Sequence, residues 1–230
     1  MIFASTCHLG LVKKENEDAL GHLENKHGNL FVVCDGVGGL PNGALASQTA
    51  VDSIISAFPL SSGNTPDLQL QYAMENGQKS VMKINPKPLG TTVVACYYYK
   101  DVVYTSWCGD SRIYHFRDSR IVWISKDHNV LHDLLNKGEG VEEIFMNPHA
   151  LTRYFGMKFV VKSDYYSFQV QSGDQILLCS DGLSNFLSEP DIIHAVTNNF
   201  PQDASNLMEK LLITEDIGAP DNFSWYIIQI

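Results

Sequence analysis

Apolar residues in the first third of the chain recur at the spacing of two helices. In residues 44–58 they fall at positions i, i+3, i+4 and i+7, which are occupied by Val51, Ile54, Ile55 and Phe58. Residues 67–84 repeat this spacing from Leu70 onward. The pattern therefore predicts two consecutive amphipathic helices, each with one face buried against the rest of the protein.

After residue 90 the period changes to that of β-strands. Four apolar or alternating runs are separated by short polar turns, and they cover residues 91–99, 102–107, 111–117 and 120–124. Strands that follow one another through such tight turns must pair antiparallel. This part of the chain therefore predicts antiparallel sheet.

The remaining segments alternate between the two periods. Ser188 and Asp191 form a capping-box signature before a helix. The other predicted elements are a strand at 31–34, helices at 128–137 and 203–213, and strands at 165–170, 174–180 and 223–230. Strands and helices come in runs without βαβ alternation, which predicts an α+β layered sandwich. We expect one domain over residues 1–230.

Composition narrows the class of protein. The chain has 230 residues, 44% hydrophobic and 18% charged, which is typical of a folded globular protein. No apolar run is long enough to span a membrane, and MIFASTCHLG lacks the basic start of a secretory signal, so we expect a cytoplasmic protein. The net charge of −10 argues against nucleic acid or an anionic membrane as partner.

The five cysteines show no C-x-x-C pair, and four of them lie in or at the end of apolar strand-like runs. Their number and placement indicate buried, reduced thiols and not a disulfide framework or a zinc site.

Acidic residues stand where the predicted strands begin or end. The apolar run in FVVCDGVGG ends on Asp35, and the segments TSWCGD and QILLCSDG place Asp110 and Asp181 after two further strands. Asp221 precedes the last strand, and Asp18 lies early in the chain. Taken alone, Asp35-Gly36 is a common turn pair.

These carboxylates would converge if their strands belong to facing sheets of one sandwich. A buried like-charged cluster is unfavourable, because it raises the pKa of its members, unless a cation compensates the charge. Carboxylates and carbonyl oxygens are the preferred ligands of Mg²⁺ and Mn²⁺. Gly36 would leave its own carbonyl free to coordinate an ion beside Asp35. The pattern therefore predicts a divalent-metal site.

Seven short motifs, in order along the chain, resemble the metal-dependent protein Ser/Thr phosphatases of type 2C. They run from Gly10 to Asn222 and comprise G-x-x-K-x-x-N-E-D, V-C-D-G-V-G-G, G-T-T, C-G-D-S-R, L-T-R-x-x-G, C-S-D-G-L and D-N. The resemblance implies an αββα sandwich, in which two antiparallel sheets are flanked by helices around a binuclear metal centre. It also implies hydrolysis of phosphoserine and phosphothreonine, with two Mn²⁺ or Mg²⁺ ions activating a bridging water for in-line attack.

The resemblance also assigns roles to individual residues. Asp35 would bridge the two ions, with the Gly36 carbonyl on one of them and Asp181 and Asp221 on the other. Asp18, with Glu17 as a second candidate, would act through bound water, and Asp110 with Asp181 would form a weaker third ion site. The catalytic set is therefore Asp35, Asp181 and Asp221, and the G-T-T and L-T-R motifs are interpreted as structural.

The chain departs from the family pattern at two positions. Lys13 stands where the motif has a phosphate-binding arginine, so we expect weaker phosphate binding, unless Lys13 is only a solvated surface lysine. Val37 stands where eukaryotic members carry histidine, which indicates a bacterial-like member. Residues 138–150 correspond to the flap of the family, and His128 is interpreted as a turn or helix-cap residue.

Two further functions stay open at this point. One is a pseudophosphatase that uses the same fold as a regulatory binding module. The other is a two-metal phosphodiesterase or nuclease, and the net charge of −10 argues against nucleic acid as its substrate. For the phosphatase we expect phosphorylated Ser/Thr proteins in signalling as partners, a cognate kinase among them. We further expect no nucleic acid, no membrane and a monomer.

Overall fold

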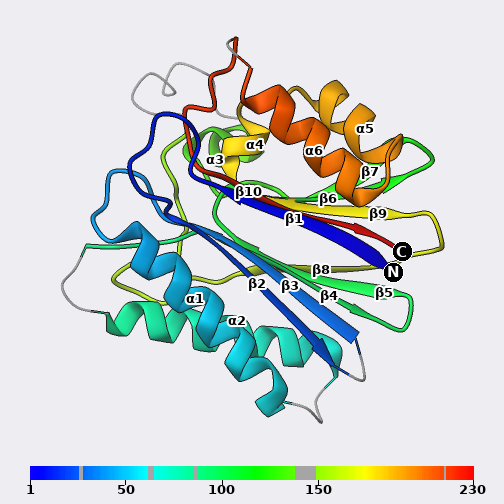
Figure 1. The fold of residues 1–230 in the computed structure, drawn as a ribbon. Helices are drawn as coiled ribbons and strands as arrows, with labels where there is room; N and C mark the ends of the chain where they lie inside the picture. The colour runs from blue at the N-terminus through cyan, green and yellow to red at the C-terminus, as the bar shows by residue number, and fades with distance from the viewer. Residues whose placement is uncertain (26–27, 62–64, 85–87, 138–148, 215) are drawn as a thin grey trace.

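Two five-stranded antiparallel sheets face each other, with helices on both outer sides (Figure 1). The computed structural model describes residues 1–230 except 26–27, 62–64, 85–87, 138–148 and 215. The predicted αββα sandwich is thereby confirmed. Most of the flap predicted over 138–150 lies outside the described residues.

The first sheet joins the two ends of the chain. Its strands, in spatial order, are β1 (Ile2–His8), β10 (Phe223–Gln229), β9 (Gln175–Cys179), β6 (Arg112–Arg117) and β7 (Arg120–Ile124). The second sheet has the order β2 (Asp18–Asn25), β3 (Gly28–Asp35), β4 (Val93–Tyr99), β5 (Val102–Cys108) and β8 (Asp164–Gln169). Strands β1 and β2 are absent from the sequence prediction, whereas every predicted strand is present.

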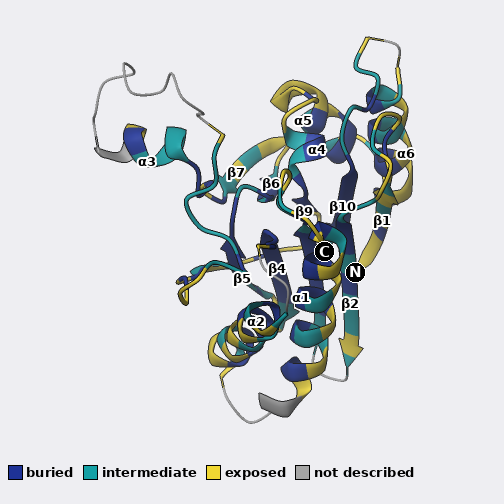
Figure 2. Ribbon diagram, turned by 90° about the vertical axis from the view of Figure 1, so that its left-hand side faces the viewer, coloured by how far each residue is buried: buried dark blue, intermediate teal, exposed yellow. Residues whose placement is uncertain are grey.

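The helices divide between the outer faces of the two sheets (Figure 1). Those over the second sheet are α1 (Gly43–Ala57), the short 3₁₀ turn η1 (Phe58–Ser61) and α2 (Pro66–Lys83). Those over the first sheet are α4 (Asp181–Ser184), α5 (Glu189–Thr197) and α6 (Pro201–Leu212), and α3 (Val130–Lys137) follows β7. As predicted, Ser188 caps α5, where its hydroxyl accepts from the Asp191 N–H at 3.3 Å. Figure 2 shows exposed positions on the outer turns of α1, α2 and α5.

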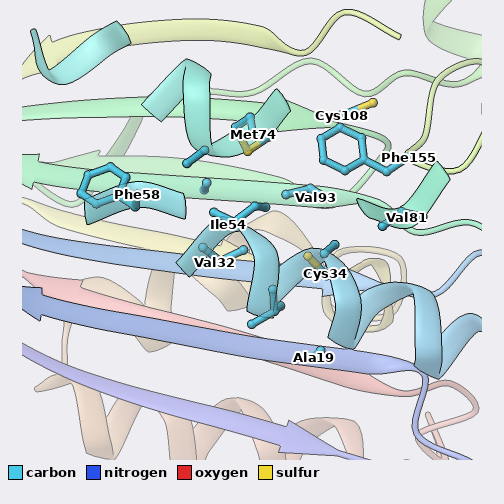
Figure 3. Packing of buried hydrophobic residues seen from close by; sticks show 14 of the residues in the cluster. Ala19, Val32, Cys34, Ile54, Phe58, Met74, Val81, Val93, Cys108 and Phe155 are labelled. Carbon is cyan, nitrogen blue, oxygen red and sulfur yellow. The ribbon is translucent and has the colours of Figure 1, made fainter. Parts of the chain in front are cut away.

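Strand alternation distributes the apolar side chains among three layers. On β3, Phe31 and Val33 pack between the two sheets, whereas Val32 and Cys34 pack against α1 and α2 (Figure 3). All four are fully buried, and burying such side chains contributes roughly 1.5–3 kcal/mol each. This two-sided burial explains why the strand reads as an uninterrupted apolar run.

The same alternation fixes where the next side chain points. Asp35 follows Cys34, so its side chain lies on the face of Phe31 and Val33, between the sheets. Its antiparallel partner on β2 is Asp18. The pairing brings two carboxylates to one end of the space between the sheets, opposite the chain termini (Figure 1).

Four cysteines, Cys34, Cys96, Cys108 and Cys179, are free and buried, as predicted. Cys7 is also free but is exposed. Within the described residues no helix is both long and apolar enough to cross a bilayer.

Candidate metal centre

A cavity of about 210 Å³ opens at the end of the sandwich where the acidic residues gather. Asp35, Asp110, Asp181 and Asp221 all line it, together with the backbone of the Gly36 segment. They come from four separate parts of the chain. Asp35 ends β3, and Asp110 and Asp181 lie just after the ends of β5 and β9. The structure therefore brings together the four carboxylates that the sequence placed at strand ends.

Gly36 is required by the packing behind the cavity. A Cβ atom at this position would lie 2.6 Å from the Gly43 backbone and 2.8 Å from the Glu17 side chain. The Gly36 N–H donates to the Glu17 carbonyl at 3.0 Å. The absence of a side chain thus lets the start of α1 close over the end of β3.

The two threonines of the G-T-T motif hold the backbone of Asp35. The Thr92 N–H donates to the Asp35 carbonyl at 2.8 Å, and the Thr91 hydroxyl donates to the same oxygen at 2.9 Å. In return, the Asp35 N–H donates to the Thr92 hydroxyl at 3.2 Å. The motif is structural, as predicted, but Thr92 also lines the cavity.

Asp18 lies behind the cavity and links the two sheets. Its carboxylate accepts from the Ser180 hydroxyl at 2.8 Å, and the Ser180 hydroxyl accepts from the Ser224 N–H at 2.9 Å. The side chain is buried, and Glu17, not Asp18, is the cavity-lining residue of the N-E-D motif. Of the acidic residues in this motif, Glu17 is therefore the one that faces the cavity.

Asp221 is held by an ion pair with Lys13. The Lys13 ammonium lies 2.6 Å from Asp221 Oδ1, and both side chains are about one-third exposed. The neighbouring Asn222 amide accepts from the Glu17 N–H at 2.9 Å and donates to the Leu9 carbonyl at 2.8 Å. Lys13 lines the cavity and belongs to a network that also positions Asp221.

Burial and mutual repulsion oppose ionisation of the carboxylates. Burial, followed by the charges of Asp18 and Asp181, raises the pKa of Asp35 well above its ordinary value. Burial is also the main cause that raises the pKa of Asp18 to about 7 and that of Asp110 to about 7. The same cause raises the pKa of Asp181. A cavity of this kind favours bound positive charge at neutral pH.

The donor set fits a hard divalent cation. All the charged cavity oxygens are carboxylates, and Asp18 Oδ1 is buried with no hydrogen-bond partner in the described part of the chain. Among the described residues, however, no three His, Cys, Asp or Glu side chains are already close enough together to hold one ion. Lys13 already engages Asp221 Oδ1 directly. Ion binding would therefore have to compete with Lys13 for that oxygen.

Two arginines near the site are paired with acids. Arg112 forms a bidentate pair with Asp127, with distances of 2.9 and 2.8 Å. Arg153 lies 2.7 Å from Asp164.

Sequence reasoning did not place the consecutive residues His149, Ala150 and Leu151 at the cavity, although all three line it. Leu151 belongs to the L-T-R motif, which was interpreted only as structural, and no local pattern distinguishes His149.

An αββα sandwich with an aspartate-lined cavity at one end of its facing sheets is the arrangement that the sequence motifs imply for a metal-dependent protein phosphatase. A comparison with protein families identifies one family: the model described as "Protein phosphatase 2C" matches residues 12–212. This chain therefore belongs to the protein phosphatase 2C family.

Curated relatives of this chain are named as phosphatases. The "Serine/threonine phosphatase stp" of Listeria welshimeri is 31% identical over 196 residues, which are 80% of this chain and 78% of that protein. "Protein phosphatase PhpP" of Streptococcus pneumoniae is 26% identical over 204 residues, 84% of this chain and 83% of that protein. The chain is thus a bacterial-type metal-dependent phosphoprotein phosphatase by family.

Solved structures agree over nearly the whole chain. The Ser-Thr phosphatase MsPP from Mycobacterium smegmatis, in complex with cacodylate, superposes with a TM-score of 0.84 at 26% identity, covering 100% of this chain and 98% of that one. The catalytic domain of the phosphatase PstP, in complex with two manganese ions, gives a TM-score of 0.82 at 25% identity, covering 98% and 96%.

Proposed function

We propose that this protein removes phosphate from phosphoserine and phosphothreonine in proteins, using two divalent ions, Mn²⁺ or Mg²⁺, in the aspartate-lined cavity. The observation that carries the proposal is the convergence of Asp35, Asp110, Asp181 and Asp221 on one cavity of about 210 Å³. The names of the Listeria and Streptococcus relatives and the manganese ions of PstP support it.

The core ions would be held by residues that the fold fixes from behind. Asp35 would contact both ions, since its backbone is held by Thr92 and its side chain opens into the cavity. The Gly36 carbonyl would complete one site, and Asp181 and Asp221 the other. When bound, the ions supply an activated water and hold the phosphate oxygens for in-line displacement.

The remaining acids would have supporting roles. Asp110, on the turn after β5, would hold a third ion together with Asp181. Asp18 would act from behind through water and keep the two sheets in register through Ser180. Glu17 would take the cavity-facing part of this role.

Lys13 would bind a phosphate oxygen of the substrate. Its side chain lines the cavity. Burial lowers the pKa of Lys13, but Asp221 and the other nearby acids raise it by more, so the net shift is upward and the ammonium stays charged. An ammonium gives one point of charge and no planar fork, so the contact would be weaker than that of an arginine.

The proposed substrates are phosphorylated proteins, including the Ser/Thr kinase that acts in the same signalling pathway. A nucleic-acid substrate is disfavoured by the acidic cavity and the net charge of −10.

Phosphate release from a phosphothreonine peptide tests the proposal. We expect release that depends on added Mn²⁺ and stops with EDTA, with little cleavage of bis(p-nitrophenyl) phosphate under the same conditions. Asp35→Asn should be inactive, whereas Glu24→Gln, which alters an exposed carboxylate on β2, should match the wild type. A wild-type protein that binds Mn²⁺ but releases no phosphate would favour the pseudophosphatase. Equal cleavage of the diester would favour a phosphodiesterase.

A further inference from the structure

His128 is a buried residue that contacts two segments of the aspartate-lined cavity. It lies between β7 and α3 and is 1% exposed. Of the two roles expected for this residue, turn or helix cap, the helix cap is wrong, because the Asn129 side chain accepts from the His132 N–H at 2.9 Å and thereby caps α3. The imidazole ring instead stacks on Trp107, with centroids 6.3 Å apart and planes inclined by 19°.

Three hydrogen bonds join His128 to two segments that line the cavity. The Gly109 N–H donates to His128 Nδ1 at 3.1 Å, and the His128 N–H donates to the Gly109 carbonyl at 2.9 Å. The Thr152 N–H donates to the His128 carbonyl at 2.9 Å. Gly109 immediately precedes Asp110, and Thr152 immediately follows Leu151, and both Asp110 and Leu151 line the cavity. One residue thus braces two walls of the cavity.

The bond to Nδ1 falls where strand pairing stops. Strand β5 ends at Cys108, so the next N–H, that of Gly109, has left the ladder and needs another acceptor. Gly109 has φ +117°, and a Cβ atom there would meet the Thr92 side chain at 2.6 Å. The imidazole therefore holds the peptide between Cys108 and Gly109, at the tight turn that leads into Asp110.

The environment of the ring fixes its tautomer. Because Nδ1 accepts from a backbone N–H, the ring proton lies on Nε2, which is 3.4 Å from Asp164 Oδ2. Asp164 is in turn paired with Arg153 at 2.7 Å. Burial lowers the pKa of His128, which keeps the ring neutral and Nδ1 available as an acceptor.

We propose that His128 is a positioning residue of the phosphatase reaction: its Nδ1 aims Asp110 into the cavity by fixing the Gly109 turn. The inference rests on the function proposed above, because it assigns Asp110 a part in that reaction. It differs from a purely packing role, in which only the volume of the ring and its stacking on Trp107 would matter.

Two amide substitutions separate the two ring nitrogens. In His128→Asn the amide oxygen can occupy the position of Nδ1, whereas nothing replaces Nε2. In His128→Gln the amide reaches the region of Nε2, and no acceptor remains at Nδ1. Asparagine leaves the larger void in the core, so packing alone predicts that the Asn variant is the less stable and the less active of the two.

We expect the opposite order for activity. His128→Gln should lower kcat on a phosphothreonine peptide by about tenfold with little change in KM, because only the aim of Asp110 is lost. His128→Asn should recover most of that rate despite a lower melting temperature. In an Asp110→Asn background, His128→Gln should lower kcat by less than about a further twofold, because a residue that acts through Asp110 has nothing left to position.

Amide hydrogen exchange of the EDTA-treated whole chain gives a readout that does not depend on activity. Exchange at the Gly109 N–H should be at least about tenfold faster in His128→Gln than in the wild type, and His128→Asn should restore protection. Equal exchange in the two variants, or an undiminished effect of His128→Gln beside Asp110→Asn, would overturn the inference. If the wild type released no phosphate, the proposed function would fail, while the exchange data would still decide whether His128 holds the turn.

Discussion

Replacing Asp110 by asparagine should stabilise the metal-free protein at high pH and have little effect at low pH. Burial raises the pKa of Asp110 from 3.8 to about 7, with further contributions from the charges of Asp181 and Asp127. Near pH 4 the folded protein keeps this carboxyl neutral at little cost. As the pH rises from about 4 to about 7, the carboxyl ionises in the unfolded chain but stays protonated in the folded protein, so the free energy of unfolding falls across this range and the loss is complete above about 7. An asparagine does not ionise and avoids this loss.

The size of the effect follows from the pKa difference. A shift from 3.8 to about 7 corresponds to roughly 4 kcal/mol at 1.36 kcal/mol per unit. Because the carboxyl lines a cavity open to solvent, screening reduces this value, and we expect about 2–4 kcal/mol at about pH 8. Near pH 4 the difference should be below about 1 kcal/mol.

Urea unfolding with EDTA at the two pH values measures this difference. The exposed Glu24→Gln on β2 is the matched control, since it removes one negative charge without relieving any burial, and it should change stability equally little at both pH values. If Asp110→Asn changes the free energy of unfolding by the same small amount at both pH values, Asp110 ionises freely. The electrostatic description of the cavity would then be wrong.

Substitutions at four other positions test the remaining assignments. Asp35→Asn should abolish phosphate release. The variant should still fold, as measured by thermal melting with EDTA, because the amide removes like charge from a buried cluster. An active variant would contradict the bridging role. Asp181→Ala and Asp221→Ala should each weaken Mn²⁺ binding by more than about tenfold in calorimetry, and wild-type affinity in either would remove that residue from the site. Lys13→Ala should raise KM for a phosphopeptide and lower kcat/KM by roughly five- to thirtyfold, with recovery in Lys13→Arg, whereas unchanged kinetics would make Lys13 a surface charge.

The elements that the sequence predicted are those whose burial is regular. The apolar run before Asp35 is buried on both faces, and α1 and α2 each bury one stripe against a sheet. Local periodicity is enough to identify such elements.

Strands β1 and β2 were missed because their pattern depends on tertiary contacts. In β1 only Ala4 is buried, and both Ile2 and Phe3 are exposed, so no period is visible. In β2, Gly21 occupies an interior strand position because Val51 and Ile55 of α1 pack directly on it. A glycine reads as a strand breaker unless the packing helix is known.

The acidic part of the site was predictable, whereas its support was not. Asp35, Asp110 and Asp181 follow recognisable strands, so their convergence could be inferred from facing sheets. The ion pair of Lys13 with Asp221 and the contact of His128 with Gly109 join segments that no local pattern relates. These contacts depend on which loops meet at one end of the sandwich.

The central claim is that the aspartate-lined cavity is a binuclear metal centre. Crystals grown with Mn²⁺ test it through the anomalous scattering of manganese. We predict two peaks inside the cavity, each about 2–2.5 Å from carboxylate oxygens, with Asp35 shared between them and Asp181 and Asp221 on one of them. Manganese bound only outside the cavity, at a concentration that supports phosphate release, would contradict the claim.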